Sequence, residues 1–164
     1  VTLKKKSMAT RSVIAKLDDN GIKAVYCHND GYLEYNGKLL DTHYTNENKV
    51  DKLLAEGDIS SLGREIGIKT DFNSSCYNKG DDFAYQCKFY ARDRDEKGTE
   101  AQEFKDDIAL LDSDLVSMSN GFVYLYAYGT WYVYDNQTIK YNDIVATYQF
   151  VELEEVLYNV KALR

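Results

Sequence analysis

The strongest constraint on the fold is the alternating apolar run at residues 122–135. From Phe122 to Ala127, aromatic side chains alternate with aliphatic ones, so the two kinds lie on opposite faces of an extended strand. Tyr128-Gly129-Thr130 interrupts the run, and Trp131-Tyr132-Val133-Tyr134 resumes it. Two β-prone segments around a short glycine-containing turn predict a β-hairpin.

This hairpin also holds several of the fifteen tyrosines of the 164-residue chain. Tyrosine combines a large apolar body with a polar tip, so an exposed tyrosine face would be a recognition patch. A covered face would be core instead. Since one sheet face must be buried, we expect the tyrosines of the hairpin to be core, namely Tyr124, Tyr126, Tyr132 and Tyr134.

A second hairpin is predicted near the start of the chain. Residues 10–17 and 22–28 are β-prone and flank Asp18-Asp19-Asn20-Gly21, a strong turn signal. A further turn, Asn29-Asp30-Gly31, closes the second strand.

Helical spacing appears between and after these hairpins. Leu39, Leu40 and Tyr44 fit one short helix, and a second begins at the N-cap Thr45 and ends before Gly57. The other segments have these predicted conformations: a capped turn at 60–63, a loop at 71–82, a strand at 83–91, a helix after the capping box at 99–102, a strand at 144–151 and a helix at 153–160.

Strands that come largely as hairpins favour an α+β domain, with an antiparallel sheet and helices packed on one face. We expect a single domain over residues 8–164. Met8 resembles a natural start, so residues 1–7 are interpreted as a leader or an appended segment.

The charge of the chain is unevenly distributed. The net charge is −7, yet residues 1–16 hold five basic and no acidic residues, which leaves −12 for the rest. We therefore do not expect a basic domain that binds nucleic acid directly. No apolar run approaches the length of a membrane span, so we expect a cytoplasmic protein with no membrane partner.

The acidic residues are concentrated at 93–114, where nine acidic and three basic residues give a net charge of −6. Such a segment is either a solvated face or a surface that occupies a partner's nucleic-acid groove. The predicted contact carboxylates are Asp93, Asp95, Glu96, Glu103, Asp106 and Asp107.

A second candidate site is the turn Tyr26-Cys27-His28-Asn29-Asp30-Gly31-Tyr32. As a ligand pocket it would use Arg11 and backbone amides for a phosphate, and a tyrosine for a base. Its predicted residues are Arg11, Tyr26, His28, Asp30 and Tyr32. A hydrolase using His28 and Asp30 is the third alternative, although strand alternation points Cys27 away from His28.

We predict no metal and no cofactor. Cys27, Cys76 and Cys87 are an odd number without framework spacing, which is typical of free thiols in a reducing compartment. With His28 they match no compact zinc motif. Phosphate-binding glycine loops are absent as well.

Several segments resemble a family of small bacteriophage and prophage proteins for which no activity is established. The similar segments are Thr10-Arg11-Ser12, residues 26–32, residues 35–40, residues 57–62, residues 90–95 and the hairpin that ends at Trp131-Tyr132. The chain departs from the family at Asn29, where Trp is common, and at Leu33, where Pro is frequent. The resemblance implies a bacteriophage setting rather than a mechanism.

The leading hypothesis is thus a non-enzymatic phage protein that inhibits a host defence or nucleic-acid-handling protein, in the manner of an anti-CRISPR protein or a DNA mimic. Its partner would carry a basic groove. The alternative is a protein that binds a nucleotide signal.

Overall fold

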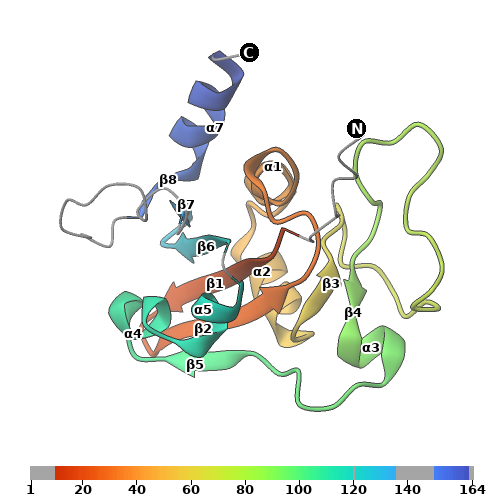
Figure 1. Cartoon of the computed structure of the whole chain (residues 1–164), viewed down its shortest axis with the longest axis horizontal. Coiled ribbons are helices and arrows are strands. Elements are labelled where there is room, and N and C mark those ends of the chain that lie inside the picture. The colour runs from red at the N-terminus through yellow and green to blue at the C-terminus, as the bar shows by residue number, and fades with distance from the viewer. Residues whose placement is uncertain (1–9, 120, 136–149, 163–164) are drawn as a thin grey trace, which may run out of the picture.

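The computed structural model describes residues 10–119, 121–135 and 150–162. Its centre is an eight-stranded sheet in the order β4-β3-β2-β1-β6-β7-β8, and β5 pairs with β2 outside this path (Figure 1). The strands are β1 (Ser12–Asp18), β2 (Gly21–Cys27), β3 (Ile59–Ser61), β4 (Lys88–Phe89), β5 (Gln102–Phe104), β6 (Phe122–Ala127), β7 (Thr130–Asp135) and β8 (Val151–Glu152).

Short helices connect and cover these strands. The first is a single π-helical turn, which continues directly into α1. The helices are η1 (Leu33–Gly37), α1 (Lys38–His43), α2 (Glu47–Ala55), α3 (Tyr90–Arg94), α4 (Asp107–Leu111), α5 (Asp114–Ser119) and α7 (Leu153–Ala162). Among the described residues, none of them is long and apolar enough to cross a membrane.

Both predicted hairpins are confirmed. Strands β1 and β2 pair antiparallel from Ser12 opposite Cys27 to Asp18 opposite Gly21, and β6 pairs likewise with β7. In the second hairpin, Tyr128 and Gly129 both have positive φ, 50° and 84°. That conformation at both central residues matches the twist of the flanking strands, so the two-residue loop is favourable.

The sheet is mixed, so the prediction of an antiparallel sheet is wrong. Strand β1 runs parallel to β6, and β2 runs parallel to β3. A parallel neighbour needs a crossover connection. The helices η1, α1 and α2 supply one between β2 and β3, because they fill most of the chain between those strands.

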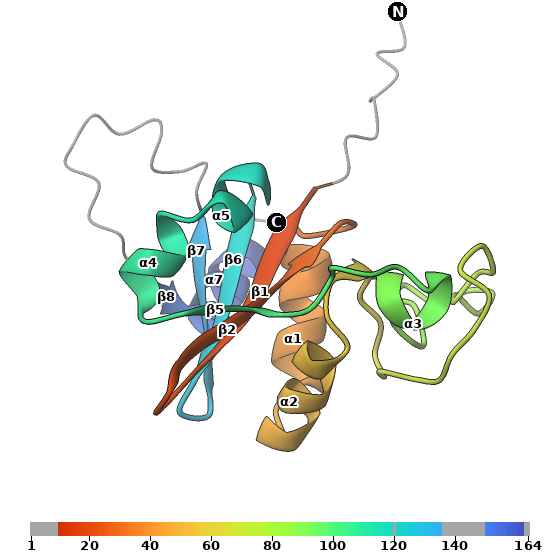
Figure 2. The ribbon, with the colours of Figure 1, turned by 90° about the horizontal axis from the view of Figure 1, so that it is seen from below.

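Helices cover both faces of the sheet, whereas the sequence suggested one. Ile14 points into a core with residues of α1, α2 and α7, and its neighbours Val13 and Ala15 point into a core with residues of α4 and α5. Figure 2 shows α4 and α5 on one side of the strands and α1 and α2 on the other. Successive side chains of β1 therefore point alternately into two apolar cores, rather than into one core and solvent.

Three of the four hairpin tyrosines are core, as expected, and Tyr132 is partly buried against the core. Tyr124 is fully buried, and Tyr126 and Tyr134 are 3% exposed. Tyr124 and Tyr126 face the α1–α2 side, while Tyr132 and Tyr134 face the α4–α5 side. Among the described residues, the exposed tyrosines are Tyr128 at the tip of this hairpin and, outside it, those at positions 32, 77, 85 and 158.

Several local predictions are corrected by longer-range pairing. Residues 59–61 form β3 rather than a capped turn, because they pair with both β2 and β4. Within residues 83–91 only Lys88–Phe89 is a regular strand, and Tyr90 already begins α3. Residues 102–104 extend along β2 as β5, so the helix begins at Asp107 and not behind the capping box.

The remaining helix ends agree more closely with the sequence. Asn46, rather than Thr45, caps α2 by accepting hydrogen bonds from the amides of Asn48 and Lys49. Gly57 follows that helix with φ of +80°, as a C-terminal glycine does. The C-terminal helix is confirmed as α7, while residues 1–9 and most of the predicted 144–151 strand lie outside the described residues.

Candidate functional site

The turn after β2 divides the predicted ligand residues into two small groups. In the first, the Tyr26 hydroxyl and Nδ1 of His28 share a hydrogen bond of 2.7 Å. Burial, and then the charge of Arg11, lowers the pKa of His28 below its ordinary value. The fold therefore favours the neutral form of this imidazole.

The second group is Asp30 with Tyr32. Asp30 has a left-handed backbone with φ of 56°. Burial raises the pKa of Asp30, although a hydrogen bond from Tyr32 opposes the shift. Asp30 in turn raises the pKa of Tyr77, after burial, which places this carboxylate toward the 70–85 loop. The His28 ring therefore bonds Tyr26, and Asp30 bonds Tyr32.

Cys27 lies on the other face of β2 from Tyr26 and His28. Its side chain is completely buried, and burial raises the pKa of the thiol to about 12. A protonated thiol on the opposite face is no nucleophile for His28 to activate. The arrangement does not support the hydrolase alternative.

Buried polar side chains form hydrogen bonds to this turn. Nδ2 of Asn36, on η1, lies 3.2 Å from Oγ of Ser12 and 3.3 Å from both Sγ of Cys27 and the carbonyl oxygen of Asn29. The Tyr124 hydroxyl donates to the carbonyl of Gly31 at 2.7 Å. These contacts connect the turn to β1, η1 and β6, while Oδ1 of Asn36 is buried without a hydrogen-bond partner among the described residues.

Asp93, the first predicted contact carboxylate, is a structural residue. Its side chain is fully buried and accepts hydrogen bonds from the amides of Phe89 and Thr70 and from the guanidinium of Arg92. Burial alone would raise the pKa of Asp93, but these donors outweigh it and hold the pKa below its usual value. Asp93, predicted as a contact carboxylate, is therefore used within the fold and is not exposed at the surface for a partner.

The other five predicted carboxylates remain at the surface, but in two groups. Near α3, Asp95 pairs with Lys69 at 3.3 Å and Glu96 pairs with Arg94. At α4, Asp106 caps the helix by accepting from the amide of Ala109. The adjacent Asp107 is exposed, and so is Glu103 on β5.

Figure 2 shows that the segment between α3 and α4 crosses one side of the molecule, past β2. Asp58 lies beneath it: burial, and then Glu96 and Glu100, raises the pKa of Asp58. Negative charge thus continues between the two groups. Residues 95–107 thus form one acidic segment.

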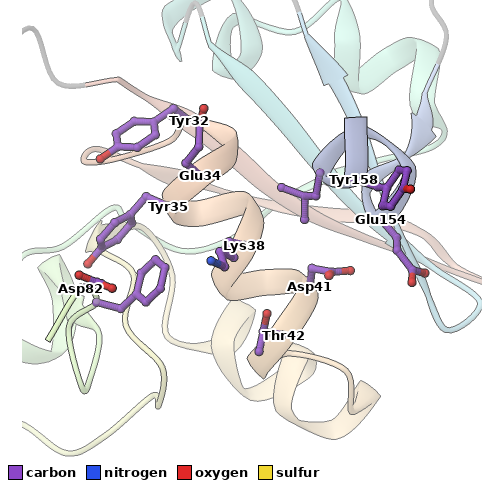
Figure 3. Close-up of a pocket in the computed structure, with 11 residues that line it drawn as sticks. Tyr32, Glu34, Tyr35, Lys38, Asp41, Thr42, Asp82, Glu154 and Tyr158 are labelled. Carbon is purple, nitrogen blue, oxygen red and sulfur yellow. The ribbon is translucent and has the colours of Figure 1, made fainter. Parts of the chain in front are cut away.

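A cavity of about 580 Å³ opens on another side of the molecule, between η1, α1, α7 and the loop at residues 82–83 (Figure 3). Aromatic side chains form one wall. The ring of Tyr35 is tilted against both neighbours, and its centroid lies 5.1 Å from that of Phe83 and 6.2 Å from that of Tyr32. Its hydroxyl shares a 2.5 Å hydrogen bond with the Tyr77 hydroxyl and accepts from the amide of Ala84. These bonds fix the wall in place.

The charge of this cavity is mostly negative. Its lining includes one ammonium, Lys38, and four carboxylates: Glu34, Asp41, Asp82 and Glu154. A phosphate would be repelled here. Nucleotide binding is thus disfavoured in the cavity, and Arg11, the predicted phosphate ligand, is not among the lining residues.

Sequence reasoning identified only Tyr32 among the cavity residues. The cavity forms because α7, at the end of the chain, packs against η1 and α1 near its beginning. No local sequence pattern predicts that α7 packs against these two helices. The one available signal is the polar face of α7 at Glu154 and Tyr158, four residues apart and hence on the same side of a helix.

Within the described ranges, no three histidine, cysteine, aspartate or glutamate side chains are grouped so as to hold a metal ion. Compared with protein-family models, curated proteins and solved structures, the chain has no match.

Proposed function

We propose that this protein is an acidic binding protein that covers a basic surface of another protein. The observation that carries the proposal is the course of the acidic segment, which crosses one side of the molecule with Asp95, Glu103 and Asp107 exposed along it. Rows of exposed carboxylates attract rows of lysine and arginine. Association driven in this way is fast and weakens with salt.

The proposed contact residues are Asp95, Glu96, Glu103, Asp106 and Asp107. Two of them pair with cations of the same chain, Lys69 and Arg94, at exposed positions. Exposed pairs contribute little to stability, so a partner's arginine can exchange with them at small cost. Glu103 and Asp107 form no ion pair within the described part of the chain and are the stronger candidates.

The partner we propose is a protein whose basic groove otherwise binds nucleic acid. Duplex DNA carries one charge per about 1.7 Å of its axis, so such grooves are lined with cations. The resemblance of the sequence to bacteriophage proteins suggests a host defence or nucleic-acid-handling protein. The proposed effect is inhibition by occlusion, without chemistry.

The test is capture from host lysate by the immobilised full chain, at low and at high salt. A double variant, Glu103→Gln with Asp107→Asn, removes two charges from the acidic segment. A matched control, Glu152→Gln with Glu155→Gln, removes two charges from exposed positions on β8 and α7.

We expect the wild-type chain to capture a partner that high salt releases. The control double variant should capture the same partner equally well. The double variant should lose roughly two- to five-fold in affinity per charge. Displacement of a DNA duplex from the captured partner would establish occlusion. Equal loss in both double variants, or capture that is insensitive to salt, would contradict the proposal.

A further inference from the structure

The cavity between α1 and α7 has the dimensions of a ligand site. Its volume of about 580 Å³ falls in the range of small-molecule pockets, about 300–1,000 Å³. Its walls come from three separate parts of the chain, and its aromatic wall is held by the Tyr35–Tyr77 hydrogen bond. A preformed wall of this kind lowers the cost of ordering a binding site.

Among the described residues, two carboxylates at one end of the cavity lack a positive counter-charge. Burial raises the pKa of Asp41, and the nearby carboxylate of Glu154 raises it further. In the described part of the chain, neither forms an ion pair with a lysine or arginine. A cation placed between them would relieve their mutual repulsion.

Lys38 does not supply that cation. Its ammonium lies toward the ring of Phe83, 6.0 Å from the centroid. In Figure 3, Asp41 and Glu154 lie on the other side of Lys38, toward α7. The acidic end of the cavity is therefore separate from the end that Lys38 occupies.

An aromatic ring and an aliphatic chain accompany the two carboxylates. Tyr158 is 73% exposed, and Figure 3 shows it beside Glu154 at the α7 wall. Leu157 lines the same wall and is partly buried against the core. Carboxylates beside an exposed aromatic face are suited to a cation that carries an apolar chain, since both parts find a partner.

We propose that this cavity binds an organic cation, a guanidinium or ammonium group on an apolar chain. Asp41 and Glu154 provide the counter-charge, and Tyr158 and Leu157 contact the chain. A metal ion fits less well, because hard cations take six or more oxygen ligands. The cation could be a free amine or an arginine or lysine side chain of a protein, and this site does not depend on the acidic segment.

The test is titration of the full chain with N-butylguanidine and with N-butylurea. The two probes have nearly the same shape, but only the first is charged at neutral pH. We expect N-butylguanidine to bind at least ten-fold more tightly in calorimetry. Equal binding of the two probes, or no binding of either, would overturn the proposal.

Variants assign the binding to this cavity. Asp41→Asn and Glu154→Gln should each weaken N-butylguanidine binding at least five-fold, whereas Glu155→Gln, which lies outside the lining, should not. Glu154 is exposed, so its variant remains informative even if Asp41→Asn fails to fold. Binding that survives Glu154→Gln unchanged would place the probe elsewhere and contradict the assignment.

A second pair of probes identifies the source of the cation. N-acetyl-arginine methylamide and N-acetyl-citrulline methylamide also differ in having a charged guanidinium or a neutral urea group, here on a peptide backbone. Tighter binding of the arginine derivative than of N-butylguanidine supports a protein side chain as the ligand, and the reverse supports a free amine. Salt-sensitive capture through the acidic segment is measured separately, so either proposal can fail while the other stands.

Discussion

Asp93 and Asp41 lie in two regions that differ in the groups surrounding the carboxylate. Around Asp93, on α3, both carboxylate oxygens accept hydrogen bonds, from two backbone amides and from Arg92. Around Asp41, on α1, the neighbouring charge is another carboxylate, Glu154. The pKa of Asp93 is lowered and that of Asp41 is raised.

The difference shows how the same side chain can serve the fold or a ligand. A carboxylate whose acceptors are all used stabilises the chain around it and has nothing left for a partner. A carboxylate that faces a like charge across a cavity costs stability until a cation arrives. The number of donors around a carboxylate, rather than its position in an acidic stretch, therefore separates structural from functional candidates.

The largest expected effect is at the satisfied carboxylate. Asp93→Ala leaves the Arg92 guanidinium, whose side chain is 12% exposed, without its counter-charge and two amides without an acceptor. Breaking a buried pair in this way costs about 3–5 kcal/mol. Denaturant unfolding measures the loss.

Asp41→Asn is the control for that measurement. It removes a carboxylate that has a like-charged neighbour, so we expect a change below about 1 kcal/mol, toward greater stability. If the two variants changed the free energy of unfolding by the same amount, the contrast between the regions would be refuted.

The pH dependence of stability should also have opposite signs at the two sites. The lowered pKa of Asp93 contributes stability above the unfolded pKa, about 3.9, and that contribution is lost as the pH falls through the folded value. The raised pKa of Asp41 imposes a cost above its folded value, and the cost disappears on acidification.

Free energies of unfolding from neutral to acidic pH for the wild type, Asp93→Asn and Asp41→Asn measure both effects. At neutral pH, Asp93→Asn should be less stable than the wild type and Asp41→Asn more stable. Both differences should shrink toward acid. A wild-type advantage over Asp93→Asn that grew on acidification would show that the sign is wrong.

The smallest expected effect on stability is at Tyr158, which is 73% exposed. Tyr158→Ala should change the free energy of unfolding by no more than about 0.5 kcal/mol. Binding of N-butylguanidine should still weaken, by roughly two- to five-fold, since exposed cation–π contacts contribute about 0.5–1 kcal/mol. Tyr128→Ala, at an equally exposed hairpin turn, is the matched control and should leave binding unchanged.

Local sequence signals specify the two hairpins and helix α2, because each of these signals lies within a few residues. The turn at Asp18–Gly21, the turn at Tyr128-Gly129 and the spacing of Val50, Leu53 and Leu54 each predict a structure that is present. Turn residues and side-chain periodicity act locally, so they can be recognised in the sequence without knowing which elements pack together.

Tertiary structure decided which strands pair and which residues form sites. Strand β1 pairs with β6 from the far end of the chain, and the segment before Phe104 is extended because β2 offers it hydrogen bonds. In sequence, Asp93 and Asp95 look alike on either side of Arg94. Only the fold brings the amides of Thr70 and Phe89 to Asp93 while leaving Asp95 in solvent.

The cavity shows the same limit most clearly. Asp41 and Glu154 belong to two helices separated by most of the chain, and each reads as an ordinary surface acid. Their proximity depends on α7 docking against η1 and α1 through Leu153, which is completely buried. Local sequence decides how each helix forms, but the burial of apolar surface between helices decides which charges meet.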